Sequence, residues 1–368
     1  MKEHILLIFG GASAEHKISC ISAASIYKAL TNLEYTVTCI GVAENNRMYL
    51  QAPTICYEER TNSEFIAIRE KESKSIVVHP GIGFFCNESK LQIDIIFPII
   101  HGNFGEDGRL QGLFDFLPIP YIGCNFFSSL LGFSKNTAKL YWERDKLPIV
   151  PYLTINEYDF KEGLANYEKS NSFSELVKRI DRKLTYPIFI KPDNSGSSLG
   201  VSKVFHANDI YKAIVSAADI SKNIIIEQAV IGREIEISIF GKYGNYYISA
   251  PGEIITDMEF YTFEAKYSTA SENTKIQVPA DLPQKIISDA QELAQLAFNS
   301  LFCKGFARID MFYELKTNKL YLNEINTLPG FTDSSMFIKL LENGGITWAE
   351  FMETLIILSR EEFNTKQK

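Results

Sequence analysis

The chain has 368 residues, 46% of them hydrophobic and 22% charged, which is enough for two or three domains with separate cores and excludes a disordered chain. The formal net charge of −8 argues against a nucleic-acid-binding surface, because phosphate backbones are bound by Lys and Arg clusters that acids do not outweigh. The N-terminal apolar stretch is too short for a signal peptide, and no run reaches the roughly 18 apolar residues of a membrane helix. We therefore expect a cytoplasmic protein that binds neither nucleic acid nor membrane.

The N-terminal third predicts an open α/β domain. The apolar run HILLIFGG (4–11) ends in two glycines and is followed by a helical pattern over 18–30. The runs TVTCIGV (36–42) and IDIIFPII (93–100) repeat the continuous apolar pattern of strands buried in a parallel sheet. Residues 1–125 are therefore expected to form an N-terminal domain around a parallel sheet.

The rest of the chain predicts two α+β domains. A helix is expected over 128–145, and a proline-punctuated connection then leads into strands and helices that we assign to a central domain at 126–230. The C-terminal domain, 231–368, is predicted to contain a polar loop at 257–275 and a helix over 283–301. It also contains the runs GFARIDMFYEL and KLYLNEIN, whose short polar connection at 316–319 indicates a hairpin.

This hairpin carries the densest group of charges. Side chains two residues apart share a face of a strand, so Arg308 lies beside Asp310 and Glu324 beside Asn326. If the strands pair in that register, two carboxylates and a carboxamide oxygen converge, and these are hard ligands suited to Mg²⁺ or Mn²⁺. Arg308 would then stabilise negative charge on a reacting oxygen, and the alternative is a salt bridge to Asp310.

The neighbours of these acids bear on a second alternative, in which the acids form the exposed polar face of an edge hairpin. On the acidic face we place Phe306, Phe312 and Leu322. On the opposite face we place Ile309, Met311, Tyr321 and Ile325. Charges among apolar side chains are costly unless they are paired or bound to a cation, which favours the metal site.

Three loops add candidates for ligand binding. The loop DNSGSSLG (193–200) offers many backbone N–H groups directly after Lys191, as phosphate-binding loops do, although a flexible hairpin tip has the same composition. The GGAS turn (10–13) lacks the dinucleotide fingerprint, yet it places Glu15 at the carboxyl end of the first strand. The loop HGNFGEDG (101–108) begins with His101, for which a structural role is equally open.

Taken together, these segments resemble the D-alanine:D-alanine ligases of the ATP-grasp superfamily. The matching segments fall in the same order along nearly the whole chain: GGASAEHKIS (10–19), HGNFGEDGRLQGLF (101–114), IPYIG (119–123), FIKPDNSGSSLGVSKV (189–204), EAKY (264–267), GFARID (305–310) and NEINTLPGFT (323–332). The resemblance implies a Rossmann-like N-terminal domain followed by a two-lobed ATP-grasp module, with lobes at 126–230 and 231–368. It also implies a homodimer that pairs through the N-terminal domain.

The resemblance further implies that the protein joins two D-alanines with ATP as co-substrate, through D-alanyl phosphate, for peptidoglycan precursors. Expected catalytic residues are Glu15, Ser197, Tyr267, Arg308 and Gly330. Expected D-alanine-binding residues are His101, Lys266, Ser335 and Met336. Expected ATP-binding residues are Lys135, Lys191, Ser198, Glu227, Glu234 and Phe260. Two Mg²⁺ ions, with Mn²⁺ as a substitute, are expected on Asp310, Glu324 and Asn326.

The resemblance also bears on the second substrate. Tyr267, in the polar loop expected to act as a lid, and Met336 are implied to favour a D-alanine acceptor over D-lactate or D-serine. Lys17, Asp193 and Asn194 depart from the family pattern but leave the expected functional residues in place. The alternatives are another ATP-grasp ligase and a binding protein that keeps the fold without catalysis.

Overall fold

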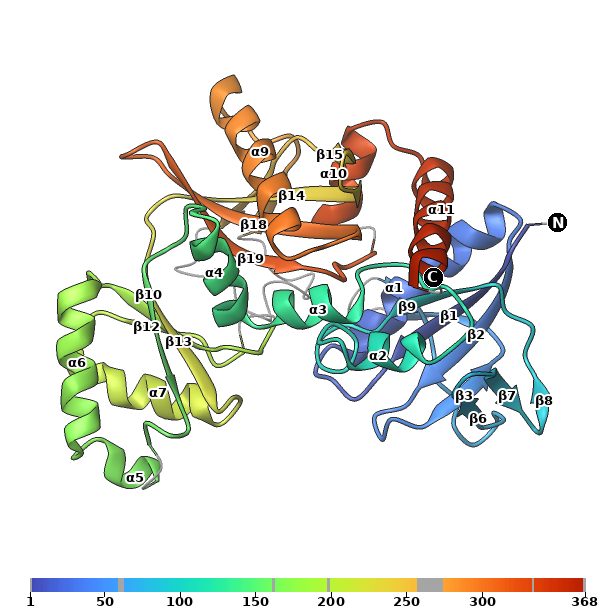
Figure 1. Cartoon of the computed structure of the whole chain (residues 1–368), viewed down its shortest axis with the longest axis horizontal. Coiled ribbons are helices and arrows are strands. Elements are labelled where there is room, and N and C mark those ends of the chain that lie inside the picture. The colour runs from blue at the N-terminus through green and yellow to red at the C-terminus, as the bar shows by residue number, and fades with distance from the viewer. Residues whose placement is uncertain are drawn as a thin grey trace.

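The computed structural model describes residues 2–58, 63–160, 163–196, 199–256, 274–332 and 334–366, and it is a mixed α/β molecule with parallel and antiparallel sheets (Figure 1). The predicted mixed α/β class is confirmed. Three sheet-bearing parts follow one another along the chain, and the C-terminal sheet lies between the other two in Figure 1. Within the described ranges, the helices are all too short or too polar to cross a membrane.

The N-terminal part is built on the four-stranded sheet β3-β2-β1-β9. β1 (His4–Gly10) pairs in parallel with β2 (Thr36–Val42) and β9 (Ile95–Ile99), as their apolar runs predict. The edge strand β3 (Met48–Gln51) is antiparallel and was not predicted. Two small antiparallel sheets were also missed, and their strands are β4 (Ile55–Glu58), β5 (Ser63–Ile66), β6 (Ile76–His79), β7 (Gly83–Cys86) and β8 (Ser89–Lys90). The helices of this part are α1 (His16–Asn32) and α2 (Arg109–Asp115).

The predicted helix over 128–145 is wrong in one respect, because two helices occupy this segment: α3 (Phe126–Phe133) and α4 (Lys135–Arg144). The break falls at Ser134, which has an extended backbone. Its side chain accepts a hydrogen bond from the backbone N–H of Thr137, which is the standard way to begin a helix. This cap turns α4 so that Trp142 is buried and donates a hydrogen bond to the carbonyl of Ala297 at 3.2 Å.

The central part is an antiparallel sheet of order β10-β13-β11-β12, made of β10 (Tyr152–Asn156), β11 (Ile188–Pro192), β12 (Ser202–Val204) and β13 (Asn223–Gln228). Its helices are α5 (Leu164–Tyr167), α6 (Asn171–Lys183), a 3₁₀ turn (Ala207–Asp209) and α7 (Ile210–Ala218). Alternate strand residues such as Ile190 and Ile226 are buried with residues of α6 and α7. The opposite face of the sheet carries Lys191 and Glu227.

The C-terminal part is a six-stranded antiparallel sheet of order β17-β16-β14-β18-β19, with β15 paired to β14. The strands are β14 (Arg233–Lys242), β15 (Asn245–Ile248), β16 (Gly252–Thr256), β17 (Thr274–Gln277), β18 (Gly305–Glu314) and β19 (Lys319–Asn326). The predicted helix over 283–301 is confirmed as α9 (Gln284–Ser300). One face of this sheet shares a core with α9 and α4, and the other face carries the charges of the predicted hairpin.

The hairpin itself is confirmed, with Arg308 opposite Asn326 and Asp310 opposite Glu324. Beyond this point the register shifts, because Asp310 pairs with Glu324 while Met311 pairs with Leu322. Asn323 is therefore the extra residue of a β-bulge.

The bulge corrects two placements. Leu322 is fully buried in the core with Met311, so its assignment to the acidic face was wrong. Tyr321 lies opposite Phe312 and therefore shares the acidic face, where we had not placed it.

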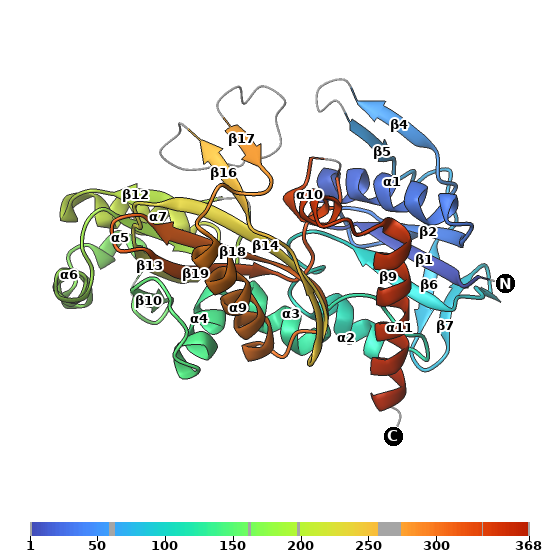
Figure 2. The same cartoon turned by 90° about the horizontal axis from the view of Figure 1, so that it is seen from above.

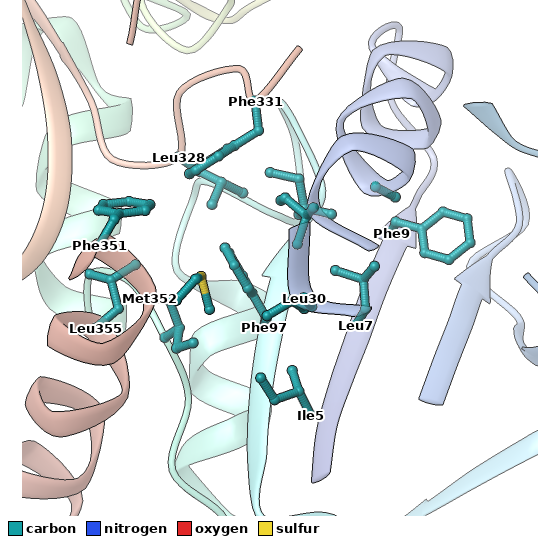
Figure 3. Packing of buried hydrophobic residues seen from close by; sticks show 14 of the residues in the cluster. Ile5, Leu7, Phe9, Leu30, Phe97, Leu328, Phe331, Phe351, Met352 and Leu355 are labelled. Carbon is teal, nitrogen blue, oxygen red and sulfur yellow. The ribbon is translucent and has the colours of Figure 1, made fainter. Parts of the chain in front are cut away.

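The end of the chain fastens the C-terminal part to the N-terminal sheet. α10 (Met336–Asn343) and α11 (Trp348–Lys366) follow the hairpin, and α11 runs between the two sheets in both views (Figures 1 and 2). Leu328 and Phe331 flank the Pro329–Gly330 turn and join the same core as Phe97 of β9 (Figure 3). The ring centroids of Phe97 and Phe331 are 5.9 Å apart. This packing holds the turn against the N-terminal domain.

Candidate active site

One cavity brings together half of the 18 predicted site residues. It lies where the loops after β1 and β9 meet the β18–β19 hairpin and the turn that follows it. Its lining includes nine of the predicted site residues: Glu15, His101, Lys135, Arg308, Glu324, Asn326, Gly330, Ser335 and Met336. Carboxyl ends of parallel strands are the usual place for ligands in open α/β sheets, which fits this position.

The floor of the cavity is the charged face of the hairpin. The Arg308 side chain donates to both Asp310 oxygens, from Nε to Oδ1 at 2.7 Å and from Nη2 to Oδ2 at 2.6 Å. Its Nε also lies 2.8 Å from Oε2 of Glu236, and Asn326 donates from Nδ2 to Asp310 Oδ2 at 3.0 Å. Burial alone would lower the pKa of Arg308, but the two carboxylates outweigh it and hold the pKa well above its ordinary value.

Glu236 was missed by sequence reasoning, and a signal for it was present. The segment REIEIS alternates polar and apolar residues, so Glu236 shares a face with Glu234. The structure pairs Glu236 with Asp310 across β14 and β18, and it pairs Glu234 with Phe312. Glu234 therefore lies on the charged face, outside the cavity lining.

Lys135 closes the cavity from α4. Its ammonium group lies 3.2 Å from Oε2 of Glu324 and donates to the backbone carbonyl of Ser195 at 2.8 Å. Burial alone would lower the pKa of Lys135, but the carboxylate of Glu324 outweighs it and raises the pKa. Lys135 thus joins the hairpin to the start of the Gly/Ser-rich loop.

A second charged group lies on the central sheet. Glu227 on β13 is nearly buried and forms ion pairs with Lys191 of β11 and with Lys139 of α4, the latter at 2.8 Å. Burial alone would raise the pKa of Glu227, but the two ammonium groups outweigh it and lower the pKa to about 2. Lys139 is fully buried, which lowers its pKa despite Glu227. Sequence reasoning missed Lys139, because nothing in a helical pattern distinguishes a buried Lys from an exposed one.

The N-terminal wall is formed by Glu15 and by the loop after β9. Glu15 precedes α1, and its Oε2 would lie 2.8 Å from a Cβ added at Gly102 and 3.3 Å from one added at Gly196. Gly102 also has a φ of +76°, which other residues rarely adopt. Glycine at these two positions therefore leaves space for the Glu15 carboxylate.

His101 is buried and bridges the N-terminal domain and the turn. Its Nδ1 donates to the carbonyl of Leu328 at 3.1 Å, and its Nε2 lies 3.0 Å from Oγ of Ser22. Glu106, which sequence reasoning missed, lies 3.5 Å from Nδ1, and burial raises the pKa of its carboxyl group. The contacts of His101 fit the structural alternative, because they hold the turn in place.

The far wall comes from the turn and the start of α10. Ser335 accepts a hydrogen bond from the backbone N–H of Thr332 at 3.0 Å, and a Cβ added at Gly330 would lie 2.7 Å from Ser335 Oγ. Met336 is buried, and its sulfur would lie 2.6 Å from a Cβ at Gly252. The absence of a side chain at Gly330 and Gly252 thus lets α10 approach the cavity.

The remaining predicted residues lie elsewhere. Lys191 and Glu227 lie on the central sheet, Glu234 on β14 and Asp310 on β18, and all four lie outside the lining of this cavity. Ser197, Ser198, Phe260, Lys266 and Tyr267 fall outside the described residues.

Comparisons with known proteins match the chain to one family along most of its length. The family model for the D-ala D-ala ligase N-terminus matches residues 4–124, and the model for the D-ala D-ala ligase C-terminus matches residues 141–357. A D-alanine–D-alanine ligase of Acetivibrio thermocellus is 38% identical over 100% of this chain and 98% of its own length.

Two solved structures are similar throughout. The D-alanine-D-alanine ligase from Coxiella burnetii has a TM-score of 0.80 at 26% identity and covers 100% of this chain and 96% of its own. VanG D-Ala:D-Ser ligase from Enterococcus faecalis has a TM-score of 0.81 at 26% identity and covers 98% of this chain and 100% of its own. The fold and the matches define the protein as a ligase. The chain belongs to the D-alanine–D-alanine ligase family.

Proposed function

We propose that this ligase joins two D-alanine molecules into D-alanyl-D-alanine, with conversion of ATP to ADP and phosphate, for peptidoglycan precursor synthesis. The observation that carries the proposal is the single cavity in which Glu15, Arg308 and Gly330 come together from three segments far apart in the chain. We propose the division into a Rossmann-like domain at 1–125 and ATP-grasp lobes at 126–230 and 231–368. We also propose a cytoplasmic location.

The reaction has two steps. In the first, the carboxylate of one D-alanine attacks the γ-phosphorus of ATP, the bond to the β-phosphate oxygen breaks, and D-alanyl phosphate and ADP form. In the second, the amine of the other D-alanine attacks the carbonyl carbon, loses a proton, and inorganic phosphate leaves. Glu15 binds the ammonium group of the first D-alanine. Arg308 and the backbone N–H of Gly330 stabilise the negative oxygen of the tetrahedral intermediate, and both line the cavity.

ATP is proposed to lie between the central and C-terminal sheets. Lys135 and Lys191 contact its phosphates, and the exposure of only about a tenth of each side chain supports this, since a desolvated ammonium binds an anion more strongly than one in water. Glu227 and Glu234 are proposed to contact the adenine and the ribose. Ser198 and Phe260 are proposed to cover the phosphates and the base.

The hairpin fits divalent cations in the chemistry of its donors. Asp310, Glu324 and Asn326 offer two carboxylates and an amide group side by side, and Mg²⁺ prefers such oxygen ligands. Among the described residues, no group of three or more His, Cys, Asp or Glu side chains is arranged to hold a metal ion. Phosphate oxygens would therefore complete the shell of two Mg²⁺ ions, for which Mn²⁺ can substitute. When bound, these cations neutralise phosphate charge during transfer.

The second substrate is proposed to be D-alanine. Met336 places an uncharged side chain beside Ser335 in the cavity lining, which suits a small apolar acceptor. Ser335 and Lys266 are proposed to bind the acceptor carboxylate. Ser197 and Tyr267 are proposed to assist Glu15, and His101 to lie near the same pocket.

A homodimer is proposed as well. Exposed aromatic side chains support it: Phe116 after α2 is 69% exposed, Phe126 on α3 is 46% exposed, and Phe302 nearby is 49% exposed. The ring of Phe127 packs against the ring of Phe302, with the ring centroids 5.7 Å apart. Such groups of exposed apolar side chains are typical of interfaces.

The function is tested by incubating the purified protein with ATP, Mg²⁺ and D-alanine and identifying the dipeptide by mass. D-alanine alone should suffice for dipeptide formation and for release of ADP and phosphate. Parallel reactions with D-lactate or D-serine as second substrate test the acceptor. A protein that binds ATP without releasing ADP under any of these conditions would instead be the binding protein of the alternative interpretation.

A further inference from the structure

Two lysines on the inner face of the central lobe share one carboxylate. Glu227 contacts Lys139 at 2.8 Å and also forms an ion pair with Lys191. The Lys139 side chain is 0% exposed, whereas 12% of the Lys191 side chain is exposed. Of the two, only Lys191 has part of its side chain exposed and can therefore reach a bound ligand.

Lys139 is held on several sides. Its Nζ lies 3.5 Å from the backbone carbonyl of Leu322 and 5.9 Å from the ring centroid of Tyr152. These contacts come from β19 and β10, so the lysine is fixed between the two sheets that are proposed to enclose ATP. A fully buried ammonium group in this place is costly unless a carboxylate compensates it, so its presence requires an explanation.

We propose that Lys139 is a positioning residue that serves as the permanent counter-ion of Glu227 and thereby frees Lys191 to exchange that carboxylate for a phosphate of ATP. This inference rests on the proposed function, because it assumes that Lys191 binds ATP.

The physical reason is the cost of a buried charge without a partner. If Lys191 were the sole cation on Glu227, its departure to a phosphate would leave a carboxylate that is only 5% exposed without its counter-ion, and this cost would subtract from ATP affinity. With Lys139 in place, Glu227 keeps one ion pair throughout. The trio of two cations and one anion also leaves one positive charge for the incoming phosphate.

The first test is Lys139→Met, which replaces the ammonium group with an apolar chain of similar length. Lys191 should then stay on Glu227, and the affinity for a non-hydrolysable ATP analogue, measured by calorimetry with Mg²⁺, should fall at least ~10-fold. The KM for ATP should rise more than kcat falls. Lys222→Met is the matched control, because Lys222 pairs with Glu157 at 2.7 Å on the surface of the same lobe and should change neither quantity.

A second variant separates this role from simple support of the fold. In Lys139→Met, Glu227→Gln the carboxylate that would trap Lys191 is gone, and the trio again carries one net positive charge. Because Glu227 is itself proposed to contact the adenine, the reference for this double variant is Glu227→Gln alone. Affinity of the double variant for the ATP analogue should lie within ~3-fold of that of Glu227→Gln, since the exchange no longer leaves a buried anion. A double variant that binds at least ~10-fold more weakly than Glu227→Gln would overturn the proposal. So would normal ATP-analogue binding by Lys139→Met.

Failure of the proposed function gives a different pattern. If the unmodified protein binds the ATP analogue and the variants show the expected pattern, but the unmodified protein forms no dipeptide, the inference stands and the proposed reaction is wrong. If it forms dipeptide but the variants show no such pattern, the inference is wrong and the reaction stands. An unmodified protein that does not bind the ATP analogue at all would overturn both.

Discussion

Replacement of Arg308 by lysine separates the charge of this side chain from its shape. The guanidinium group makes three short contacts with carboxylates, two to Asp310 at 2.7 and 2.6 Å and one to Glu236 at 2.8 Å. A lysine ammonium group keeps the charge, but it cannot span two carboxylates with the same planar geometry. The residues on both sides of it, Asp310 and Glu236, are almost fully buried.

The size of the effect follows from these contacts. Lysine retains about one of the two hydrogen bonds to Asp310, and a hydrogen bond to a charged group contributes roughly 1.5–3 kcal/mol, so Arg308→Lys should lower the free energy of unfolding by about 2 kcal/mol. Removal of one donor to a negatively charged transition state lowers kcat by about 10²–10³-fold. We expect a loss of that size, because a lysine at this position does not reach the same oxygen in the same orientation.

The assay is steady-state ADP release with saturating D-alanine and ATP, together with thermal unfolding. The matched control is Arg233→Lys on β14, because Arg233 also binds a carboxylate with two nitrogens, at 2.7 and 2.5 Å from Glu253, but lies outside the cavity lining. The control should lose some thermal stability and keep kcat within ~2-fold. A near-normal kcat for Arg308→Lys, or an equal loss in the control, would refute the catalytic role of Arg308.

Three further predictions concern the metal site, a domain contact and pH. Glu324→Gln should reduce kcat by at least ~10²-fold while circular dichroism stays unchanged, because it removes the anionic group that is proposed to bind the metal and also the ion pair to Lys135. Near-normal turnover at any Mg²⁺ concentration would contradict this. Gly305→Ala should lower the apparent Tm more than Gly244→Ala. The backbone strain is the same in both variants, since the φ values are +83° and +84°, but only at Gly305 would the new Cβ lie 2.8 Å from the backbone of Gly123. Equal shifts in Tm would contradict this. Folding lowers the pKa of Glu227 from 4.5 to about 2, so its ion pairs should add roughly 3 kcal/mol to the free energy of unfolding above pH 4.5. This contribution should disappear as the pH falls toward 2. The decrease in Tm on acidification should therefore be smaller in Glu227→Gln than in the unmodified protein. Parallel curves of Tm against pH for the two proteins would contradict this.

The parts of the fold that periodicity predicted are those whose burial is uniform. β1, β2 and β9 are continuous apolar runs, and the structure pairs all three in one parallel sheet. The edge strand β3 and the small sheets beyond it were missed, because short strands with one exposed face carry a mixed pattern that resembles a loop. The break at Ser134 was missed for a local reason, since its capping hydroxyl group interrupts a segment that is otherwise helical throughout.

In the charged hairpin, the alternation of strand faces predicted some side-chain positions correctly and others wrongly. A period of two correctly placed Arg308, Asp310, Glu324 and Asn326 on one face, because no irregularity separates the residues within either pair. It failed at Leu322 and Tyr321, because the bulge at Asn323 inserts one residue and exchanges the faces of everything before it in β19. No residue type in KLYLNEIN marks the bulge, so the pattern alone could not have located it.

Lys139 and Glu236 were missed for a reason that concerns function. Sequence reasoning selects residues that are expected to contact a ligand. Lys139 and Glu236 instead contact partners of such residues: Lys139 is linked through Glu227 to Lys191, and Glu236 contacts Arg308 directly, and both Lys191 and Arg308 are proposed to bind ligands. A group that must leave one partner for a ligand needs a second counter-ion to remain behind, since a buried charge without one is costly. The requirement arises only when three charges meet in space, and a linear pattern does not contain it. Buried charges that share a partner with a ligand-binding residue are therefore where this structure adds most to what its sequence predicts.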